Sequence, residues 1–274
     1  MIDTIANEIL ALHGVRPTDT INFAKEVDLR IEYLKRYIRK TKLKGFVLGI
    51  SGGVDSTTAG RLCQLACEEL RKDGADAEFY AVRLPYGVQK DEADAQAALL
   101  FIKPDHIITV DIKEATNAIH YQLDSLASEP AVLDFNKGNV KARMRMIAQY
   151  EIAGLRNCLV VGTDHNAELV PAFYTKWGDQ ACDITVLDGL NKRQVRRMAQ
   201  ELGAPMELFS KTPTADLEDL KPLNPDEVAL GFTYNDLDDF LEGKTVDRAA
   251  LEKIVMQFDK TRHKRNFPVA FTQK

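Results

Sequence analysis

The sequence predicts an α/β fold in which a parallel β-sheet is flanked by helices. Short apolar runs alternate along the chain with longer segments of helical periodicity. The apolar runs are continuous rather than alternating, which is typical of parallel strands buried on both faces. Apolar residues make up 45% of the 274 residues, so the chain can bury a substantial core. We expect one domain over residues 1–274, with N- and C-terminal helices packed on the α/β core.

The expected elements follow one another in a regular order. A helix within the first forty residues is indicated by apolar side chains three or four positions apart: Phe23, Val27, Ile31, Leu34 and Ile38. The expected strands are the apolar runs at residues 45–50, 78–84, 106–110, 157–162 and 183–187. The helical patterns between and after them cover residues 55–72, 91–101, 114–127, 139–155 and 192–202. The last forty residues return to a helical pattern.

Residues 203–225 have a different character. Prolines interrupt this polar stretch at positions 205, 213, 222 and 225, so it cannot form one long helix. Loops of this length in compact domains are commonly either functional lids or disordered segments. We therefore expect part of this segment, KTPTADLEDL at residues 211–220, to close over a site.

Charge and composition argue against several kinds of partner. The net charge is −5 and the pI is about 5.6, whereas broad nucleic-acid binding needs clustered positive charge. No stretch approaches the roughly 18 apolar residues that span a membrane, and the N-terminus MIDTIANEIL does not resemble a secretion signal. We expect neither a nucleic-acid nor a membrane partner, and a cytoplasmic location.

The cysteines do not predict a zinc site. There are four of them, and no two form a CxxC pair. Cys63 and Cys67 lie four positions apart within a helical pattern, which favours a packing role.

The most informative motif is GISGGVDSTTAG (residues 49–60), which joins the first expected strand to its helix. Its glycines allow a tight turn and a close approach of the backbone to a ligand. The N–H groups at the start of the following helix favour an anion, and Ser51 and Ser56 add hydroxyl donors. The motif predicts a phosphate cradle, although it matches neither GxxxxGK[ST] nor GxGxxG.

Asp55 stands where a P-loop would have its lysine. A carboxylate beside a polyphosphate is repulsive unless a cation bridges them, so its natural role is to hold Mg²⁺. Glu168 follows another expected strand at the same sheet edge and would supply a second carboxylate, although taken alone it is equally consistent with a surface helix residue. The alternative is a simple turn at Gly52 and Gly53, with Asp55 as a helix cap.

The segment SGGVDS resembles the pyrophosphate-binding loop of the N-type ATP pyrophosphatases, which cleave ATP between its α and β phosphates to adenylate an acceptor. Within that superfamily, further segments resemble the ammonia-dependent NAD synthetases. They are VRLPYGVQ (82–89), GNVKARMRMIAQY (138–150), VGTDHNAE (161–168), FYTKWGDQACDI (173–184), LNKRQV (190–195), KTPTADLEDL (211–220) and HKR (263–265). The resemblance extends from about the first helix to the C-terminus. It implies a Rossmann-like fold of the adenine nucleotide alpha hydrolase-like kind.

The resemblance also implies a reaction and its participants. The reaction is the ATP-dependent amidation of deamido-NAD to NAD with ammonia, the last step of NAD biosynthesis, through an adenylated intermediate and with release of AMP and pyrophosphate. Mg²⁺ is the implied cofactor, ATP the co-substrate and a homodimer the implied assembly. The implied ATP-binding residues are Gly49, Ile50, Ser51, Gly52, Gly53, Val54, Asp55, Ser56, Arg83, Gln89, Thr163, Lys192 and Thr214.

The remaining implied roles concern the second substrate, the metal and catalysis. The deamido-NAD-binding residues are Arg143, Lys176, Asp183, His263 and Lys264. Asp55 and Glu168 are implied as the Mg²⁺ ligands, and Asp55, Lys192 and Asp183 as catalytic residues. Asp183 is also a candidate for the base that deprotonates ammonium.

Two other classes of protein share the phosphate loop. A tRNA-modifying or GMP-forming pyrophosphatase would be expected to carry a basic extension, paired cysteines or a glutaminase partner. A regulatory module that senses ATP without turnover would have little need of a second dinucleotide site. Glutamine-using relatives carry an additional amidotransferase domain, for which 274 residues leave no room. We therefore expect free ammonia as the donor, unless a separate subunit delivers it.

Overall fold

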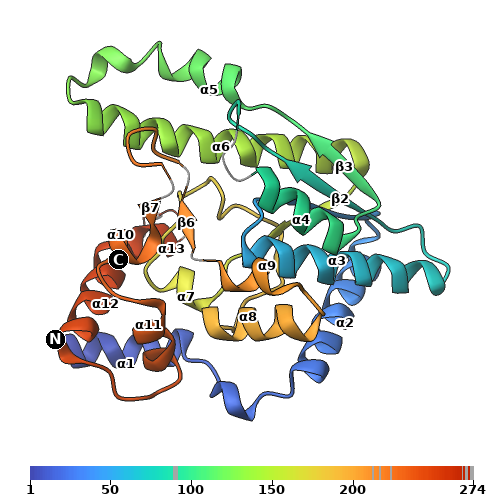
Figure 1. Ribbon diagram of the computed structural model, residues 1–274, viewed down its shortest axis with the longest axis horizontal. Coiled ribbons are helices and arrows are strands. Elements are labelled where there is room, and N and C mark those ends of the chain that lie inside the picture. Colours follow the sequence, from blue (N-terminus) through green and yellow to red (C-terminus); the bar gives the residue numbers. More distant parts are fainter. Residues whose placement is uncertain are drawn as a thin grey trace.

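A five-stranded parallel sheet forms the centre of the computed structural model, in the strand order β3-β2-β1-β4-β5 (Figure 1). The strands are β1 (Gly45–Gly49), β2 (Glu78–Arg83), β3 (His106–Thr109), β4 (Leu159–Gly162) and β5 (Ile184–Thr185). Each neighbouring pair is parallel; Phe46 of β1, for example, is in register with Phe79 of β2 and Leu159 of β4. The expected α/β fold with a parallel sheet is confirmed.

The structure describes residues 1–88, 92–211, 213–215, 217–222 and 224–266, together with residues 268 and 271. At residues 214 and 215 it describes the backbone only. Within this part of the chain, no helix combines the length and the apolarity that a membrane crossing requires.

Helices cover both faces of the sheet. One face packs against α2 (Phe23–Thr41), α3 (Val54–Lys72), α4 (Glu92–Ile102), α8 (Lys192–Glu201) and α9 (Met206–Ser210). The other packs against α6 (Pro130–Arg156), which in turn contacts α5 (Lys113–His120). Alternate residues of β1 point to opposite faces: Phe46 and Leu48 to the first and Val47 to the second. This double burial explains the continuous apolar character of the strands.

The two ends of the chain pack together beside the sheet (Figure 1). Side chains from α1 (Ile2–His13), α11 (Tyr234–Leu241) and α12 (Arg248–Lys260) form a separate apolar cluster. Ala167 of α7 (Asn166–Leu169) belongs to the same cluster. The terminal helices therefore hold the segment that follows β4. The remaining short helices are η1 (Thr18–Thr20), η2 (Asp124–Leu126), α10 (Asp226–Leu230) and α13 (Arg262–Arg265).

Several element boundaries differ from the prediction, including those of α5, α6 and β5. The helix expected at residues 139–155 begins nine residues earlier at Pro130, because proline suits the first helical turn, whose N–H groups have no partner within the helix. The helix expected to reach residue 127 ends at His120. The strand expected at residues 183–187 is only Ile184–Thr185, although the following Val186 and Leu187 are still buried in the core.

As expected, the described residues of the proline-containing segment 203–225 do not form one long helix. It contains α9 and a small antiparallel pair, β6 (Thr214–Ala215) with β7 (Asn224–Pro225). We call its described residues 213–215 and 217–222 the lid.

Candidate active site

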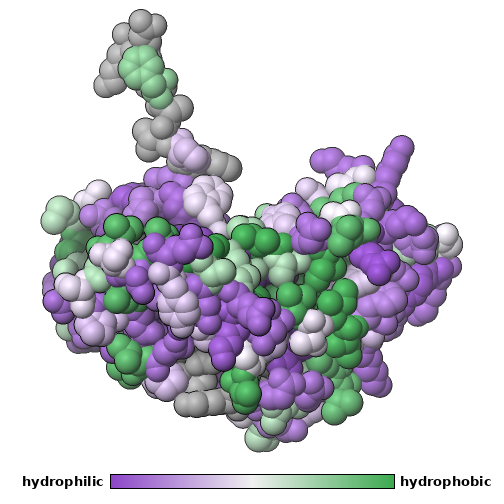
Figure 2. All heavy atoms as spheres, turned by 90° about the horizontal axis from the view of Figure 1, so that it is seen from above, coloured by the Kyte–Doolittle hydropathy of each residue, from purple (hydrophilic) through white to green (hydrophobic). Residues whose placement is uncertain are grey.

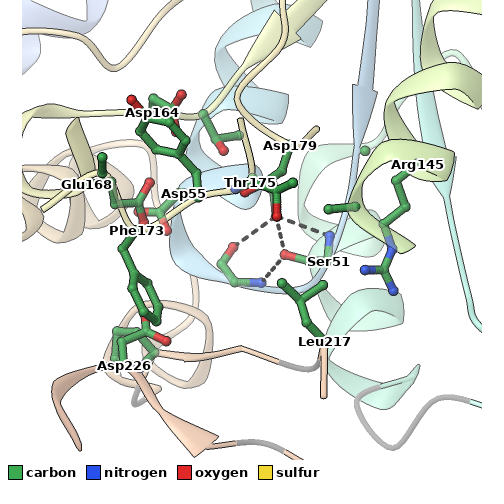
Figure 3. Close-up of a pocket in the computed structure, with 18 of the residues that line it drawn as sticks. Ser51, Asp55, Arg145, Asp164, Glu168, Phe173, Thr175, Asp179, Leu217 and Asp226 are labelled. Atoms are coloured by element: carbon green, nitrogen blue, oxygen red, sulfur yellow. Dashed lines mark hydrogen bonds between the residues drawn. The ribbon is translucent and has the colours of Figure 1, made fainter. Parts of the chain in front are cut away.

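The strand order reverses between β1 and β4, and a large cavity lies at their carboxyl ends. In open α/β sheets this is the place where ligands bind. The cavity has a volume of about 770 Å³. Figure 3 shows Asp55, Glu168 and Asp164 to one side of it and Ser51 and Arg145 to the other.

The phosphate-cradle motif forms the turn from β1 into α3. Gly52 has φ +86°, and a β-carbon there would lie 2.7 Å from the backbone nitrogen of Ala95, so only glycine fits. Ser51 Oγ accepts the N–H of Gly53 at 3.2 Å and lies 3.2 Å from Ser56 Oγ. The N-cap of α3 is Gly53, which has no side chain to bond the first N–H groups of the helix. Asp55 is therefore not the helix cap, and its carboxylate has other partners.

Asp55 belongs to a cluster that we call the acid–lysine centre: Asp55, His165, Glu168 and Lys192. Lys192 Nζ donates to Asp55 Oδ2 at 2.7 Å and to Glu168 Oε1 at 3.0 Å. His165 Nε2 lies 3.2 Å from Asp55 Oδ1 and 3.5 Å from Lys192 Nζ. The first turn of α3, the start of α7 and the first residue of α8 thus converge at one point.

The charges of this centre stabilise one another. Burial opposes the charge on Asp55, but Lys192 and His165 outweigh it and hold the pKa of the carboxyl below its usual range. Burial likewise opposes the charge on Lys192, which is only 1% exposed, yet Asp55 and Glu168 raise its pKa well above the ordinary value. Asp55 and Lys192 are therefore both ionised at neutral pH.

Lys192 is held at its backbone as well as at its amine. Asn191 and Gln194 form a capping box at the start of α8. Asp238 of α11 accepts the N–H of Lys192 at 3.0 Å and that of Arg193 at 2.7 Å. Two basic residues at the positive end of a helix are normally unfavourable. The negative charge of Asp238 faces this end of α8 and compensates for them. Burial nevertheless raises the pKa of Asp238 to about 6.

The same centre has a donor set that fits a divalent cation. One ligand atom from each of Asp55, His165 and Glu168 lies within 4.8 Å of the others. Carboxylate oxygens are the ligands that Mg²⁺ prefers, and a position beside a phosphate-binding loop is usual for it. These residues therefore have the chemistry required to hold the ion.

Sequence reasoning missed two acids that line the cavity: Asp164, which is buried, and Asp179, which is exposed. Burial raises the pKa of Asp164 well above its usual value, and the neighbouring charge of Glu168 adds to the effect. Desolvation by the surrounding protein also raises the pKa of Asp179, whose Oδ1 accepts the N–H of Thr175 at 2.9 Å. Both lie within segments that carry the family resemblance, VGTDHNAE and FYTKWGDQACDI. Their position in these segments could have identified both residues as candidates for the site.

The helix α6 forms another wall of the cavity, with Phe135, Asn139, Ala142, Arg145 and Gln149. Gln149 Oε1 accepts the N–H of Gly49 at 2.7 Å and so fixes the end of β1 from the opposite face of the sheet. None of the polar residues of this wall was predicted from the sequence.

The predicted ATP-binding residues divide into those that line the cavity and those that do not. The cavity is lined by Gly49, Ile50, Ser51, Gly53, Val54, Asp55, Ser56, Thr163 and Lys192. Arg83 is buried beside the cavity and donates to both carboxylate oxygens of Glu92, at 2.9 and 2.6 Å. Gly52 turns toward α4, the backbone of Thr214 lies in β6, and Gln89 lies outside the described residues.

Four of the five predicted deamido-NAD-binding residues lie together. Arg143 donates to the carbonyl oxygen of Lys176 at 3.2 Å, and Lys176 Nζ donates to the carbonyl oxygen of His263. Lys264 Nζ donates to the carbonyl oxygen of Tyr174 at 2.8 Å. His263 and Lys264 line the cavity, and Arg143 and Lys176 lie next to its rim through these contacts.

The fifth, Asp183, is not part of this group. It is exposed, it precedes β5 rather than following it, and its carboxylate accepts the N–H of Val160 at 2.8 Å. The hydroxyl group of Tyr150 donates to Asp183 Oδ1 at 3.4 Å. The structure thus places Asp183 against the sheet and outside the cavity lining.

The lid is docked on α6. Asp134 accepts the N–H groups of Asp219 and Leu220, both at 2.8 Å. Lys141 donates to the carbonyl oxygen of Leu217 at 2.8 Å and to the carboxylate of Asp219 at 2.5 Å. Leu217 also lines the cavity, so the lid closes part of it in this structure.

Comparison with known proteins connects this site to a family. A family model described as NAD synthase matches residues 26–268. The chain is 53% identical over 264 residues to the NH(3)-dependent NAD(+) synthetase of Exiguobacterium sibiricum, with 96% of each chain covered.

Two solved structures are similar over nearly the whole chain. The NAD+ synthetase of Burkholderia pseudomallei superposes with a TM-score of 0.82 at 49% identity, covering 96% of both chains. The NMN synthetase of Francisella tularensis superposes with a TM-score of 0.80 at 30% identity, covering 92% of this chain and 100% of its own. The matches span both the phosphate-binding turn and the residues gathered around it, and this protein therefore belongs to the NAD synthase family.

Proposed function

We propose that this protein catalyses the ATP-dependent amidation of deamido-NAD⁺ by ammonia, giving NAD⁺, AMP and pyrophosphate. The observation that carries the proposal is the meeting of the SGGVDS turn and the acid–lysine centre at one end of a cavity of about 770 Å³. The cluster of basic residues around His263 and Lys264 lines another part of the same cavity. The site thus offers places for two phosphate-containing substrates.

In the first step, the pyridine carboxylate of deamido-NAD⁺ attacks the α-phosphorus of ATP, and the bond to pyrophosphate breaks. The uncapped N–H groups at the start of α3 and the hydroxyls of Ser51 and Ser56 are placed to hold the phosphates. The Lys192 ammonium supplies positive charge where the departing pyrophosphate becomes more negative. Alignment and charge neutralisation are the main requirements of this chemistry, so no protein nucleophile is needed.

Asp55 and Glu168 would hold Mg²⁺ in this site, with His165 beside them. When bound, the ion neutralises phosphate charge. The carboxylates of Asp55 and Glu168 face the Lys192 amine, and Asp55 itself belongs to the SGGVDS turn at the start of α3.

In the second step, ammonia attacks the activated carbonyl carbon, a C–N bond forms, and AMP leaves with the electrons of the C–O bond. Ammonium must first lose a proton. We place the acceptor at Asp164 or Asp179 rather than at Asp183, because both line the cavity and desolvation there makes their carboxylates stronger bases than usual. The lid would restrict the entry of water, which competes with ammonia for the adenylate.

The second substrate would occupy the basic part of the cavity. Its pyrophosphate requires cationic partners, and Arg143, Lys176 and Lys264 supply them within one hydrogen-bonded group that includes His263. The apolar ring of Phe135, which lines the cavity and is partly exposed, offers a surface for a pyridine or adenine ring.

We also propose that the protein forms a homodimer through the face that carries η2 and α6. Exposed apolar side chains gather on these elements: Leu126, Val132, Phe135, Ile147 and Leu155. Figure 2 views this side of the molecule and shows apolar residues reaching the surface between polar ones. Because Phe135 also lines the cavity, a partner on this face would border the site.

The chain is proposed to act as one domain in the cytoplasm. Helices from both ends of the chain pack beside α7, which carries Glu168 of the site. All four cysteines are free thiols, which suits a reducing compartment.

The deciding experiment is product analysis by chromatography with ATP, Mg²⁺, ammonium and deamido-NAD⁺. NAD⁺ and AMP are expected in equal amounts, and nicotinate mononucleotide in place of deamido-NAD⁺ is expected to be a poor substrate. Glutamine in place of ammonium should give little product. ADP as the product would contradict the proposal, whereas nucleotide binding without turnover would favour the ATP-sensing alternative.

A further inference from the structure

Lys192 occupies the position between the two carboxylates that are the proposed ligands of Mg²⁺. Its amine is 2.7 Å from Asp55 and 3.0 Å from Glu168. An ion that bound either of these oxygens at about 2.1 Å would lie within about 5 Å of Nζ. At such a separation inside the protein, the two cations would repel each other strongly.

The amine has little freedom to leave this position unaided. Lys192 is 1% exposed, its backbone is fixed by Asp238, and its Nζ also lies 5.0 Å from the centre of the Tyr234 ring. Removing a buried ammonium from two partly buried carboxylates without a replacement partner is costly. The lysine therefore requires an incoming anion before it can give up these contacts.

The balance of charge indicates the order of events. The two carboxylates and the ammonium leave one negative charge in excess. Addition of a divalent cation alone would turn this into one positive charge in excess at a buried point, whereas a nucleotide brings its own negative phosphates. From this geometry we propose that Lys192 is a stand-in cation of the nucleotide-free protein, and that a divalent ion enters the centre only together with ATP.

This inference rests on the proposed metal role of Asp55 and Glu168, and it assigns Lys192 a positioning role in addition to its proposed contact with phosphate. In the empty site the ammonium holds the two carboxylates together. Once phosphates are present, the amine turns to them, and the two carboxylates become available to the ion.

The test is Mn²⁺ binding followed by electron paramagnetic resonance, with and without a non-hydrolysable ATP analogue. Mn²⁺ takes the same oxygen ligands as Mg²⁺. The wild type alone is expected to bind Mn²⁺ at least about tenfold more weakly than the wild type with the analogue. A sample of Mn²⁺ and analogue without protein gives the reference signal of the complex in solution.

The Lys192→Met variant provides the sharper comparison. Without the analogue it is expected to bind one Mn²⁺ at least about tenfold more tightly than the wild type, because the carboxylates have lost their cation. Its melting temperature should fall and then rise again when Mn²⁺ is added, whereas that of the wild type should respond little. Lys35→Met is the matched control, since Lys35 is also a buried lysine paired with two carboxylates, Glu32 and Glu69. It should lose stability without gaining Mn²⁺ affinity.

Equal Mn²⁺ affinity of Lys192→Met and the wild type, both without analogue, would overturn the inference. If Lys192→Met does not fold, the wild type decides: tight binding without analogue overturns the inference, and binding that tightens with the analogue supports it. NAD⁺ production by the wild type is measured separately. An active enzyme that binds Mn²⁺ equally with and without analogue would refute the inference and leave the proposed function standing. Absence of Mn²⁺ uptake in every sample would refute both the metal assignment and the inference.

Discussion

Gly138 of α6 lies against the backbone of Leu217 in the lid. A β-carbon at position 138 would come within 3.2 Å of the Leu217 carbonyl oxygen and 3.1 Å of its β-carbon. The same helix carries Asp134 one turn earlier and Lys141 about one turn later, and both bond the lid. One face of α6 is therefore shaped to receive the lid backbone, with glycine at the point of closest approach.

Substitution of Gly138 is expected to weaken lid docking. Gly138→Val should raise the KM for ATP and lower kcat, so that kcat/KM falls about tenfold, because the lid must move away from α6. The matched control is Gly154→Ala in the same helix, where a β-carbon meets nothing within 4 Å. That variant should gain up to about 1 kcal/mol of stability, since alanine favours a helix, and should keep its kinetics. Initial rates and thermal unfolding of both proteins are the measurements.

Asp134→Ala is expected to release the lid without unfolding the sheet. Asp134 is buried and accepts two backbone N–H groups of the lid, and each of them left unbonded costs about 1–3 kcal/mol if the lid stays in place. The lid should therefore open, and chymotrypsin should cut after the exposed Leu220 several times faster. Asp124→Ala, at an exposed position in η2, should be cut at the wild-type rate. Equal cleavage of both variants would show that Asp134 does not hold the lid.

The sequence was sufficient to predict that the carboxylates of Asp55 and Glu168 lie close together beside the phosphate-binding turn, whereas His165 of the acid–lysine centre was not among the predicted site residues. Ser51, Asp55, Thr163 and Glu168 each follow a parallel strand, and parallel strands end at one edge of a sheet. The position of Asp183 was not predictable in the same way. It precedes β5, so parallel pairing places it level with Val160 in the middle of β4.

The contribution of α6 could not be predicted for a different reason. The apolar and charged residues of α6 are distributed around its whole circumference, so the sequence does not indicate which face of the helix meets the cavity. In the structure, Phe135, Asn139, Ala142 and Gln149 form the stripe that lines the cavity. Arg143 is one position away from that stripe and points toward Lys176 instead. Only tertiary packing settles the rotation of such a helix.

Asp179→Asn is expected to separate adenylation from amidation. Pyrophosphate release should continue, because Asp179 is not a member of the acid–lysine centre and bonds Thr175 instead, but NAD⁺ formation should fall about 10²-fold or more if this carboxylate takes the ammonium proton. The adenylate would then be lost to water, giving AMP without NAD⁺. Asp183→Asn should keep AMP and NAD⁺ in equal amounts. Parallel losses of both products in Asp179→Asn would point instead to a structural role.

Asp55→Asn is expected to abolish adenylation and leave the fold intact. The asparagine keeps the shape of the side chain but removes the charge that Lys192 and the proposed cation share. Pyrophosphate release should fall by about 10³-fold, and the circular dichroism spectrum should be unchanged. Glu168→Gln serves as the companion variant, since it faces the same amine. Near-normal turnover by both variants would refute the metal role of these carboxylates.

The stability of the protein in acid is expected to depend on Glu242, a carboxylate away from the cavity. Glu242 accepts hydrogen bonds from Lys244 Nζ at 2.8 Å, Thr18 Oγ1 at 2.5 Å and Asn191 Nδ2 at 3.0 Å. It thereby links the N-terminal segment to the residue that caps α8, on which Lys192 stands. Burial opposes its ionisation, but these bonds outweigh burial and lower the pKa of Glu242 from 4.5 to about 2.

A depressed carboxyl pKa stabilises the folded state most at a pH above the pKa of the unfolded chain. This stabilisation should amount to at most about 3 kcal/mol, and it should be lost as the pH falls from about 4.5 to about 2. Urea unfolding at pH 7, 5, 4 and 3 measures it. Glu242→Gln should be less stable than the wild type at pH 7, and the difference should shrink steadily below pH 5. Glu201→Gln, at an exposed position of α8, should follow the wild-type curve. A constant difference between Glu242→Gln and the wild type at every pH would mean that the carboxylate acts through packing alone, because a shifted proton equilibrium must leave a pH-dependent difference.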